Sequence, residues 1–419
     1  MNKFASLARI WLTRSFKPFY FSNTYDKILD YGNIDSLGLY IHIPFCRSIC
    51  AFCPYCKVVY NQKEAKKYIE ALLKEIEMVG NMGDGSKKRV TSLYFGGGTP
   101  ALLIDDIARI IAKVNEYFII TEGVGLELHP LDVTVDKLAK LKAVGVTKIS
   151  IGIQSFQEEF LELLGRTTNN YEGMFRALEE VEFETVSMDF IFALPNQTID
   201  HVKADIEKAF ANHANHVAIY PFIDFTYTDN KFPLVSNKAK RKLLYEIVAY
   251  CNKMGYARDS IWTFSKNGRA KYSSMTRDNF LGFGCSATTL LKEQFKINTF
   301  DIHEYINRID GGELATSLTI KFTLRQRMVY YLFWTLYSMR LDPKAFDKFF
   351  DKKFNRYYGF EILVARLLGF IKKQSGRYVM TTRGSYYYHY FENFYTLSYI
   401  DQMWSLMKNE AFPEELIVE

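Results

Sequence analysis

The sequence has no long apolar run, and it is poor in cysteine, proline and histidine. Its 419 residues include 10 Pro, 7 His and 6 Cys. No stretch approaches the length of a membrane span, and Arg9, Arg14 and Lys17 interrupt the apolar N-terminus, which argues against a secretory signal. The formal net charge of +6 is too small and too dispersed to predict nucleic-acid binding. Cysteines that cluster along the chain predict a reducing compartment, so we expect a cytoplasmic protein.

Aromatic residues, in contrast, are abundant, with 34 Phe and 29 Tyr. They are compatible with large apolar pockets, or with nothing beyond genomic composition. At helical spacing, one face of an N-terminal helix carries Phe4, Leu7, Ala8, Trp11 and Leu12. That face suits either the protein's own surface or an anionic membrane, so peripheral contact with the inner face of a membrane remains open.

Four of the six cysteines lie within residues 40–60, YIHIPFCRSICAFCPYCKVVY, namely Cys46, Cys50, Cys53 and Cys56. An apolar run ending at Pro44 precedes them, which predicts a loop directly after a strand. Spacings of four and then three residues let one loop surround a soft-metal centre. The C-x-x-C spacings also fit zinc, although structural zinc usually takes two separated pairs.

Strand and helix patterns then alternate along the chain. The sequence predicts strands over residues 39–43, 90–95, 124–128, 148–153, 186–192 and 216–220, separated by helices. This alternation predicts a parallel sheet with right-handed crossovers, either a barrel or a doubly wound sheet. From about residue 321 the pattern becomes helix-rich, and a hairpin signal over residues 371–381 suggests a winged-helix-like end.

Unusual polar groups follow these strands, at the end where barrel enzymes build their sites. Gly96, Gly97, Gly98 and Thr99 end one strand, and free backbone groups on such a run can bind a polar ligand. Later strands end near further polar residues: Glu127, Gln154, Ser155, Arg166 and Asp189. Each could be a satisfied structural group. Together they could hydrogen-bond a ribose, a carboxylate and an ammonium.

The C-x3-C-x2-C core, with Phe52 before its third cysteine, resembles the signature of the radical S-adenosylmethionine (SAM) enzymes. YFGGGTP, ELHP, ISIGIQSF, LGRT, MDFIFALPNQT and LGFGCSA narrow the resemblance to enzymes like oxygen-independent coproporphyrinogen III oxidase. The resemblance covers about residues 39–287. It implies an α/β fold, a partial (β/α)6 barrel similar to a TIM barrel, with a helix-rich, winged-helix-like C-terminal domain.

The same resemblance implies a [4Fe-4S] cluster on Cys46, Cys50 and Cys53, reductive cleavage of SAM, and a second SAM beside the first. On that basis the cofactor-binding residues are Tyr40, Phe52, Gly96, Gly97, Gly98, Thr99, Glu127, Gln154, Ser155, Arg166, Asp189 and Gly284. Candidates for a proton acceptor are Tyr40, His129, Tyr220 and Glu127. A low-potential donor such as flavodoxin or ferredoxin would supply electrons.

Departures from the oxidase pattern shape the functional hypothesis. Cys56 comes three residues after Cys53, where the oxidase has its fourth cysteine after two, and the N-terminal extension is short. Residues 271–280 lack the His-Asn and Tyr-Trp element of the haem-chaperone relatives. We therefore favour a methyltransferase of this branch (class C type) that acts on an sp2 carbon of a planar hydrophobic substrate, with menaquinone preferred.

Two alternatives stay open. One is an oxidase-type or haem-modifying enzyme of the anaerobilin synthase type, and the other is a haem carrier without turnover. We expect an N-terminal extension over residues 1–37, a core barrel over 38–235, a connecting segment over 236–320 and a C-terminal substrate domain over 321–419. Cys56 could be a spare thiol, an alternative ligand or an inert packing residue, and Cys285 is treated as a small buried hydrophobe.

Overall fold

The computed structural model describes residues 3–24, 28–167, 171–266 and 278–418. Its centre is a run of six parallel strands that are rich in buried apolar residues. Their spatial order follows their order along the chain: β2 (Gly38–Ile43), β6 (Leu93–Gly97), β8 (Val124–Leu128), β9 (Val146–Gln154), β10 (Thr185–Phe192) and β11 (His216–Pro221). A doubly wound sheet would reverse its strand order, so the barrel alternative is confirmed.

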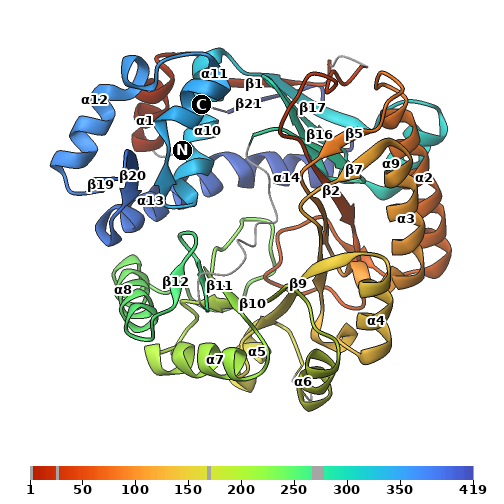
Figure 1. The fold of residues 1–419 in the computed structure, drawn as a ribbon, viewed down its shortest axis with the longest axis horizontal. Coiled ribbons are helices and arrows are strands. Elements are labelled where there is room, and N and C mark those ends of the chain that lie inside the picture. Colours follow the sequence, from red (N-terminus) through yellow and green to blue (C-terminus); the bar gives the residue numbers. More distant parts are fainter. Residues whose placement is uncertain (1–2, 25–27, 168–170, 267–277, 419) are drawn as a thin grey trace.

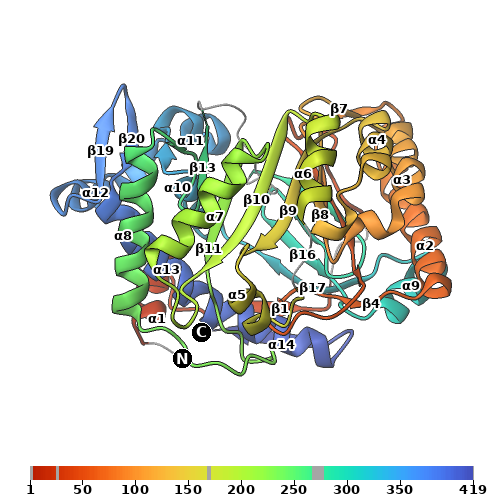
Figure 2. The ribbon, with the colours of Figure 1, turned by 90° about the horizontal axis from the view of Figure 1, so that it is seen from below.

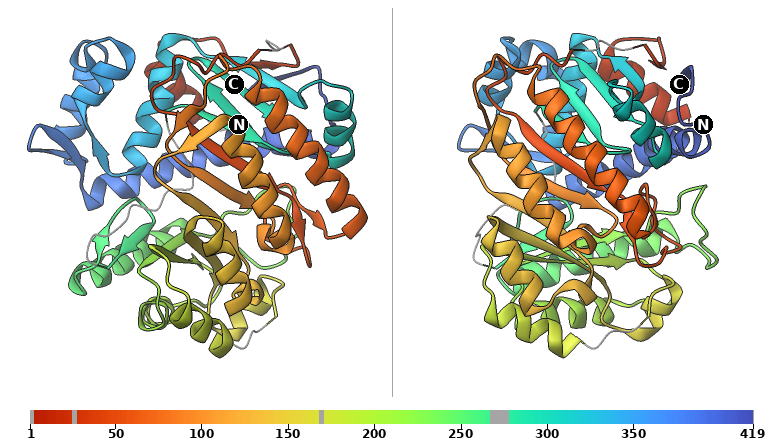
Figure 3. Two further views of the ribbon diagram at one scale, coloured as in Figure 1. Left: turned by 45° about the vertical axis from the view of Figure 1, so that its right-hand side comes forward. Right: turned by 90° about the vertical axis from the view of Figure 1, so that its right-hand side faces the viewer.

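Helices cover the outer side of these strands (Figure 2). They are α2 (Gln62–Gly80), α3 (Ile104–Tyr117), α4 (Val135–Ala143), α5 (Glu158–Leu163), α6 (Tyr171–Glu180) and α7 (Ile199–Ala211). Side-chain oxygens cap several of them, for example Asn61, which accepts from the backbone N–H groups at the start of α2. Helices α2 and α3 lie side by side (Figure 3). The carboxyl ends of all six strands therefore share one face of the barrel.

The sheet continues beyond β2, which the sequence analysis did not predict. Strand β14 (Phe280–Phe283) pairs parallel with β2, and antiparallel partners extend the sheet from it. They are β15 (Thr288–Leu291), β16 (Gln294–Asn298), β17 (Thr316–Lys321), β1 (Phe19–Ser22) and β21 (Glu415–Val418). At the other edge, β13 (Thr263–Ser265) pairs with β11, and β12 (Ala257–Arg258) follows it. Strands from both ends of the chain, β1 and β21, therefore belong to this one sheet.

One expected strand is wrong in its extent. Residues 90–95 do not form a single strand, because β5 (Lys88–Val90) pairs with β7 (Phe118–Ile120) in a separate sheet. Strand β6 begins only at Leu93, after a break at residues 91–92. Residues 90–95 read as one continuous strand, so the sequence pattern could not reveal that Val90 and Leu93 belong to strands in different sheets.

The C-terminal third is helix-rich, as predicted (Figure 1). The expected hairpin over residues 371–381 forms β19 (Ile371–Gln374) and β20 (Arg377–Met380), and β18 (Arg340–Leu341) joins them in a three-stranded sheet. The helices are α8 (Asn237–Lys253), α9 (Ile302–Asp310), α10 (Leu324–Tyr337), α11 (Pro343–Phe350), α12 (Phe354–Leu367), α13 (Thr382–Tyr395) and α14 (Asp401–Asn409). The N-terminal helix α1 (Lys3–Thr13) packs against α10 and α13. Among the described residues, no helix is long and apolar enough to cross a bilayer.

Candidate functional site

The three signature cysteines lie on one loop at the carboxyl end of β2. Two short strands, β3 (Phe45–Cys46) and β4 (Val58–Val59), pair across the base of this loop and hold it closed. Cys46, Cys50 and Cys53 are half-buried and free. Burial, followed by the neighbouring thiols of Cys53 and Cys50, raises the pKa of Cys46 to about 11. The two neighbouring sulfurs therefore lie close enough to Cys46 to disfavour its ionisation, and a cationic cluster would remove that cost.

Ion pairs fix the cysteine loop to the barrel. Arg47 donates two hydrogen bonds of 2.5 Å to the fully buried carboxylate of Asp132, which also accepts from Lys137. Burial raises the pKa of Asp132, but Arg47 and Lys137 outweigh it and the net pKa is lowered. On the other side, Arg166 Nε lies 3.4 Å from Cys50 Sγ. The sequence analysis missed Arg47 and Asp132, because neither interrupts an apolar pattern.

The glycine run ends β6 directly beside the first cysteine. The Gly98 N–H donates to the carbonyl oxygen of Ile43 at 2.7 Å. A Cβ atom built on Gly98 would lie 2.9 Å from Cys46 Sγ and 2.5 Å from the Phe45 carbonyl oxygen. Gly97 has φ +115°, a conformation that L side chains rarely adopt. The backbone of Gly97 and Gly98 therefore lies directly beside the Cys46 sulfur, with no side chain between them. This arrangement leaves room for a cluster on Cys46 and for a small polar molecule beside the cluster.

Two carboxyl groups extend the site into the barrel. Glu127 on β8 accepts from Gly97 N–H at 3.2 Å and from the Tyr94 hydroxyl at 3.1 Å. Asp189 on β10 accepts from Ser150 at 2.7 Å and from Ser187 at 3.1 Å. Burial, and then the charge of Asp189, raises the pKa of Glu127 to about 7, while burial raises the pKa of Asp189 to about 6. An ammonium or ribose ligand would favour the ionised forms.

These raised pKa values predict a pH dependence for the cofactor-free protein. The folded-state pKa of Glu127 lies above its ordinary value of 4.5, so its contribution to stability is lost as pH rises from about 5 through 7. We expect the melting temperature of the cofactor-free protein to be a few degrees higher at pH 5.5 than at pH 8, measured by calorimetry. Glu127→Gln should flatten this profile, and an unchanged profile would contradict the assignment.

Most of the other predicted cofactor residues gather around the same space. Tyr40 on β2 donates to His42 Nδ1 at 3.1 Å and stacks on Tyr94. Gly96 faces the Tyr40 hydroxyl and the Glu127 carboxyl, and Thr99 hydrogen-bonds to Cys46. Phe52 lies 5.7 Å below the Arg166 guanidinium. Gln154 ends β9 at φ +71°, beside Gly152.

Ser155 and Gly284 are engaged elsewhere. The Ser155 hydroxyl is fully buried and donates to Asp205 of α7 at 2.8 Å. The backbone N–H of Gly284 donates to the buried carboxylate of Glu75 at 2.7 Å, and a Cβ atom there would lie 2.4 Å from the Tyr68 hydroxyl. We interpret both residues as supports of the site's walls, since neither leaves a polar atom facing the barrel interior.

The proton-acceptor candidates differ in their surroundings. His129 accepts from Leu131 N–H through Nδ1 at 3.2 Å, and burial, then the charge of Arg166, lowers its pKa to about 4. It is therefore neutral at pH 7. Tyr220 is 40% exposed near the end of β11, and Tyr40 is half-buried beside Glu127. Geometry favours Tyr40 and Glu127 over Tyr220 as groups near the cofactor space.

An aromatic wall closes the site on the side of α14. Trp404 lies 5.7 Å from Tyr55 of the cysteine loop and stacks on Phe225 at 6.1 Å. Two cations accompany this wall. Lys57 donates to the carbonyl oxygen of Cys53, and Lys408 lies 4.2 Å from the Tyr227 ring centroid. Burial, and then the charge of Lys57, lowers the pKa of Lys408. Two ammonium groups therefore lie close together beside the cysteine loop.

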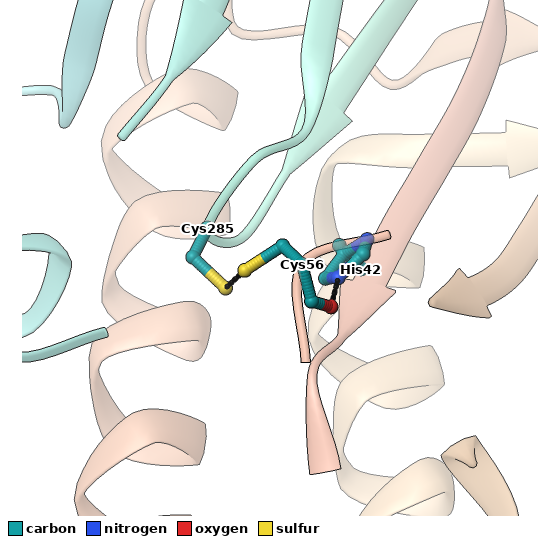
Figure 4. A group of neighbouring side chains, drawn as sticks. All are labelled: His42, Cys56 and Cys285. Atoms are coloured by element: carbon teal, nitrogen blue, oxygen red, sulfur yellow. Dashed lines mark hydrogen bonds between the residues drawn. The ribbon is translucent and has the colours of Figure 1, made fainter. Parts of the chain in front are cut away.

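Cys56 does not join the other three cysteines. Its buried Sγ lies 3.7 Å from Cys285 Sγ, and its backbone carbonyl contacts His42 (Figure 4). A zinc knuckle built from Cys53 and Cys56 is therefore not supported by this arrangement. The segment over residues 271–280, compared above with the chaperone relatives, lies largely outside the described residues, which resume at 278.

Comparisons with known proteins agree with this geometry. The family described as the radical SAM superfamily matches residues 40–209. The haem chaperone HemW of Lactococcus lactis is 30% identical over 64% of this chain and 73% of its own length. The oxygen-independent coproporphyrinogen III oxidase of Escherichia coli is 26% identical over 77% of this chain and 76% of its own length. The solved structure of that oxidase, HemN, superimposes with a TM-score of 0.76 at 22% identity, covering 91% of this chain and 97% of HemN.

Proposed function

This chain belongs to the radical SAM superfamily and to its HemN-like branch. We infer from this that it is an enzyme acting on a tetrapyrrole with carboxylate side chains. Members of the superfamily use a [4Fe-4S] cluster and SAM. When bound, these groups supply a hydrogen-atom abstraction that no side chain can perform. The cysteine loop, the bare glycine backbone and Glu127 are the parts of this chain that we expect to hold them.

The observation that carries the substrate proposal is the pairing of the aromatic wall with two cations. Tyr55, Phe225 and Trp404 offer flat apolar surface next to the cysteine loop. Besides burial, the charge of Lys57 lowers the pKa of Lys408, so the two ammonium groups repel each other, and Asp229 and the thiols of Cys53 and Cys56 act against this effect. An anionic ligand would relieve that repulsion. A neutral quinone would not relieve the repulsion between the two ammonium groups, whereas the propionates of a porphyrinogen or haem would relieve it.

The proposed reaction is removal of a propionate carboxyl from a porphyrinogen. The side chain loses one hydrogen atom and one electron and releases carbon dioxide, which leaves a vinyl group; a one-electron acceptor must take the electron. Lys57 and Lys408 would hold carboxylates, and the aromatic wall would orient the ring and exclude water. The curated relatives are oxidases and haem chaperones, which supports this alternative better than the methyltransferase hypothesis of the sequence analysis.

The deciding assay uses anaerobic, cluster-reconstituted, dithionite-reduced protein with SAM and a panel of coproporphyrinogen III, haem and menaquinone in vesicles. We expect 5′-deoxyadenosine together with vinyl product from the porphyrinogen. S-adenosylhomocysteine and a methyl gain on the quinone, which would need the second SAM, would overturn the proposal in favour of methyl transfer. A Soret band with haem but no SAM cleavage would favour a carrier. Lys57→Ala with Lys408→Ala should raise the KM for a carboxylated substrate about tenfold.

Peripheral membrane contact is a further part of the proposal, and it rests on exposed apolar residues of two neighbouring helices. Helices α1 and α12 are neighbours (Figure 1), and the ring centroids of Trp11 and Phe360 lie 6.1 Å apart. With Leu7, Leu363 and Leu367 they form what we call the α1–α12 patch. Leu367 is 79% exposed. Arg14, Arg356 and Arg366 flank the patch, and Arg14 pairs with Glu361, so its surroundings are net positive and complement anionic lipid.

We therefore expect the full-length protein to sediment with vesicles that contain phosphatidylglycerol and not with purely neutral vesicles. Leu363→Glu should abolish sedimentation, because it places a carboxylate in the centre of the patch. The matched control is Leu234→Glu, a residue that is 60% exposed outside the patch. Equal binding by both variants, or a dimer in which the patch is covered, would contradict membrane contact.

A further inference from the structure

His42, Cys56 and Cys285 come together from three separate segments (Figure 4). His42 lies on β2, Cys56 follows the signature cysteines, and Cys285 lies in the turn between β14 and β15. All three are buried, with exposed fractions of 3%, 6% and 0%. One potential ligand atom from each residue lies within 4.8 Å of the other two. Among the described residues, this is the group whose spacing suits a single ion.

The separation of the two sulfurs matches a tetrahedral site. Cys56 Sγ and Cys285 Sγ lie 3.7 Å apart. Two thiolates bound to one zinc ion at about 2.3 Å, with a tetrahedral angle between them, would lie about 3.8 Å apart. Cys56 Sγ also lies 3.2 Å from the carbonyl oxygen of Phe300, which closes another side of the same space. The sulfurs would therefore need almost no movement to bind one ion.

Hydrogen bonds around the three residues hold their positions, as the outer partners of metal ligands do. His42 Nε2 donates to the Cys56 carbonyl at 2.9 Å, because a carbonyl can only accept, so Nδ1 accepts from Tyr40. The Tyr68 hydroxyl accepts from Cys285 N–H at 3.0 Å and donates to the His42 carbonyl at 2.8 Å. Tyr68 thus ties both strands of the site together.

The turn that carries Cys285 is held from the opposite side by a buried carboxylate. Glu75 of α2 accepts from Gly284 N–H at 2.7 Å, from Asn298 at 2.9 Å and from Tyr305 at 2.7 Å. Asn298 also donates to the Gly284 carbonyl. Such a network is more than two packed thiols require, because it fixes the direction of Cys285 within the core.

We propose that His42, Cys56 and Cys285 form a second metal site, distinct from the three signature cysteines, which binds one thiolate-preferring divalent cation of the zinc class. Both thiols release their protons to solvent when the cation binds. The imidazole proton moves from Nε2 to Nδ1, where the Tyr40 oxygen accepts it, and Nε2 binds the ion in place of the Cys56 carbonyl. Two thiolates and a neutral imidazole leave the site without net charge, so its burial carries no unpaired charge.

Such a site would join the end of the cysteine loop to the β14–β15 turn, 229 residues away along the chain. The competing explanations are a thiol–thiol hydrogen bond and a disulfide. Both account for two neighbouring sulfurs, but neither predicts bound metal. The proposal does not depend on which substrate the enzyme takes, because it rests on the positions of three buried side chains and not on the aromatic wall.

The test measures zinc and iron in the same untagged protein by elemental mass spectrometry. The cluster is first reconstituted under anaerobic conditions, so that Cys46, Cys50 and Cys53 are occupied, and one equivalent of zinc is then added before desalting. We expect about one zinc per chain in the wild type. Zinc should be lost in Cys56→Ser and in Cys285→Ser while four irons are kept, and retained in Cys251→Ser, which removes another fully buried cysteine.

Retained iron shows that each variant is folded, and zinc-edge X-ray absorption should report two sulfur ligands and one nitrogen. A wild type that binds no zinc would overturn the proposal. So would zinc that survives both cysteine replacements, or a Cys56–Cys285 disulfide in the peptide map of the anaerobic protein. If the variants lose iron as well, cobalt(II) titration of a cluster-free variant that carries Cys46→Ala, Cys50→Ala and Cys53→Ala decides. Intense tetrahedral bands near one equivalent support the site, and their absence overturns it.

Discussion

Cys50→Ala is expected to leave a folded protein that retains almost no iron and forms no 5′-deoxyadenosine from SAM. The physical reason is that three thiolates hold the cluster, and losing one removes both a strong bond and one side of the loop that surrounds it. Cys50 is half-buried and contributes little to the core, so its removal should change the melting temperature of the cofactor-free chain only slightly. Iron content, the cluster's electron paramagnetic resonance signal and SAM cleavage measure the effect.

The same loss is expected for Cys46→Ala and Cys53→Ala, and the control is Cys251→Ala in α8. Cys251 is fully buried, with Arg258 the one neighbouring charge that affects its pKa. The substitution Cys251→Ala should therefore lower the stability of the protein and leave the cluster intact. Cys56→Ala tests whether Cys56 binds the cluster as Cys46, Cys50 and Cys53 are expected to do. If it loses the cluster as completely as Cys50→Ala, then Cys56 is a cluster ligand and its pairing with Cys285 does not describe the loaded protein.

Local sequence patterns predicted the barrel well because each strand and helix of the βα units carries its own signal. Residues 199–211, for example, show helical periodicity and form α7 over the same span. The antiparallel extension could not be predicted, because strands such as β1 and β21 pair only after the chain ends meet, and four residues give too few alternations to detect. The pairing of β14 with β2 also depends on contacts between distant segments.

The candidate site divides in the same way. Residues within strands, such as Glu127 and Asp189, could be found because a carboxyl group in an apolar strand is conspicuous. Cys285 was treated as inert, since a lone cysteine carries no signal until the fold places Cys56 3.7 Å away. Trp404 and Lys408 could not be assigned either, because they reach the site from α14, almost at the end of the chain.

Gly98→Ala is expected to reduce SAM cleavage by about 10- to 100-fold, since a shift of about 1 Å at reacting groups has effects of that size. The added Cβ would lie 2.5 Å from the Phe45 carbonyl oxygen and 2.9 Å from Cys46 Sγ. Backbone cannot swing aside as a flexible side chain can, so β6 and the cysteine loop must separate. The cluster ligand and the glycine backbone would then no longer share one surface.

The matched control is Gly32→Ala, where no atom lies within 4 Å of the added Cβ and φ is ordinary. Gly32→Ala should match the wild type, because it adds a methyl group in open space. The measurement is single-turnover formation of 5′-deoxyadenosine in reconstituted protein, with iron content determined on the same sample. If Gly98→Ala keeps four irons but binds SAM weakly, the glycine backbone contacts SAM. If iron falls as well, the main role of Gly98 is to leave room for Cys46. Wild-type cleavage by Gly98→Ala would show that neither role applies, because the cysteine loop then tolerates the displacement that the contacts require.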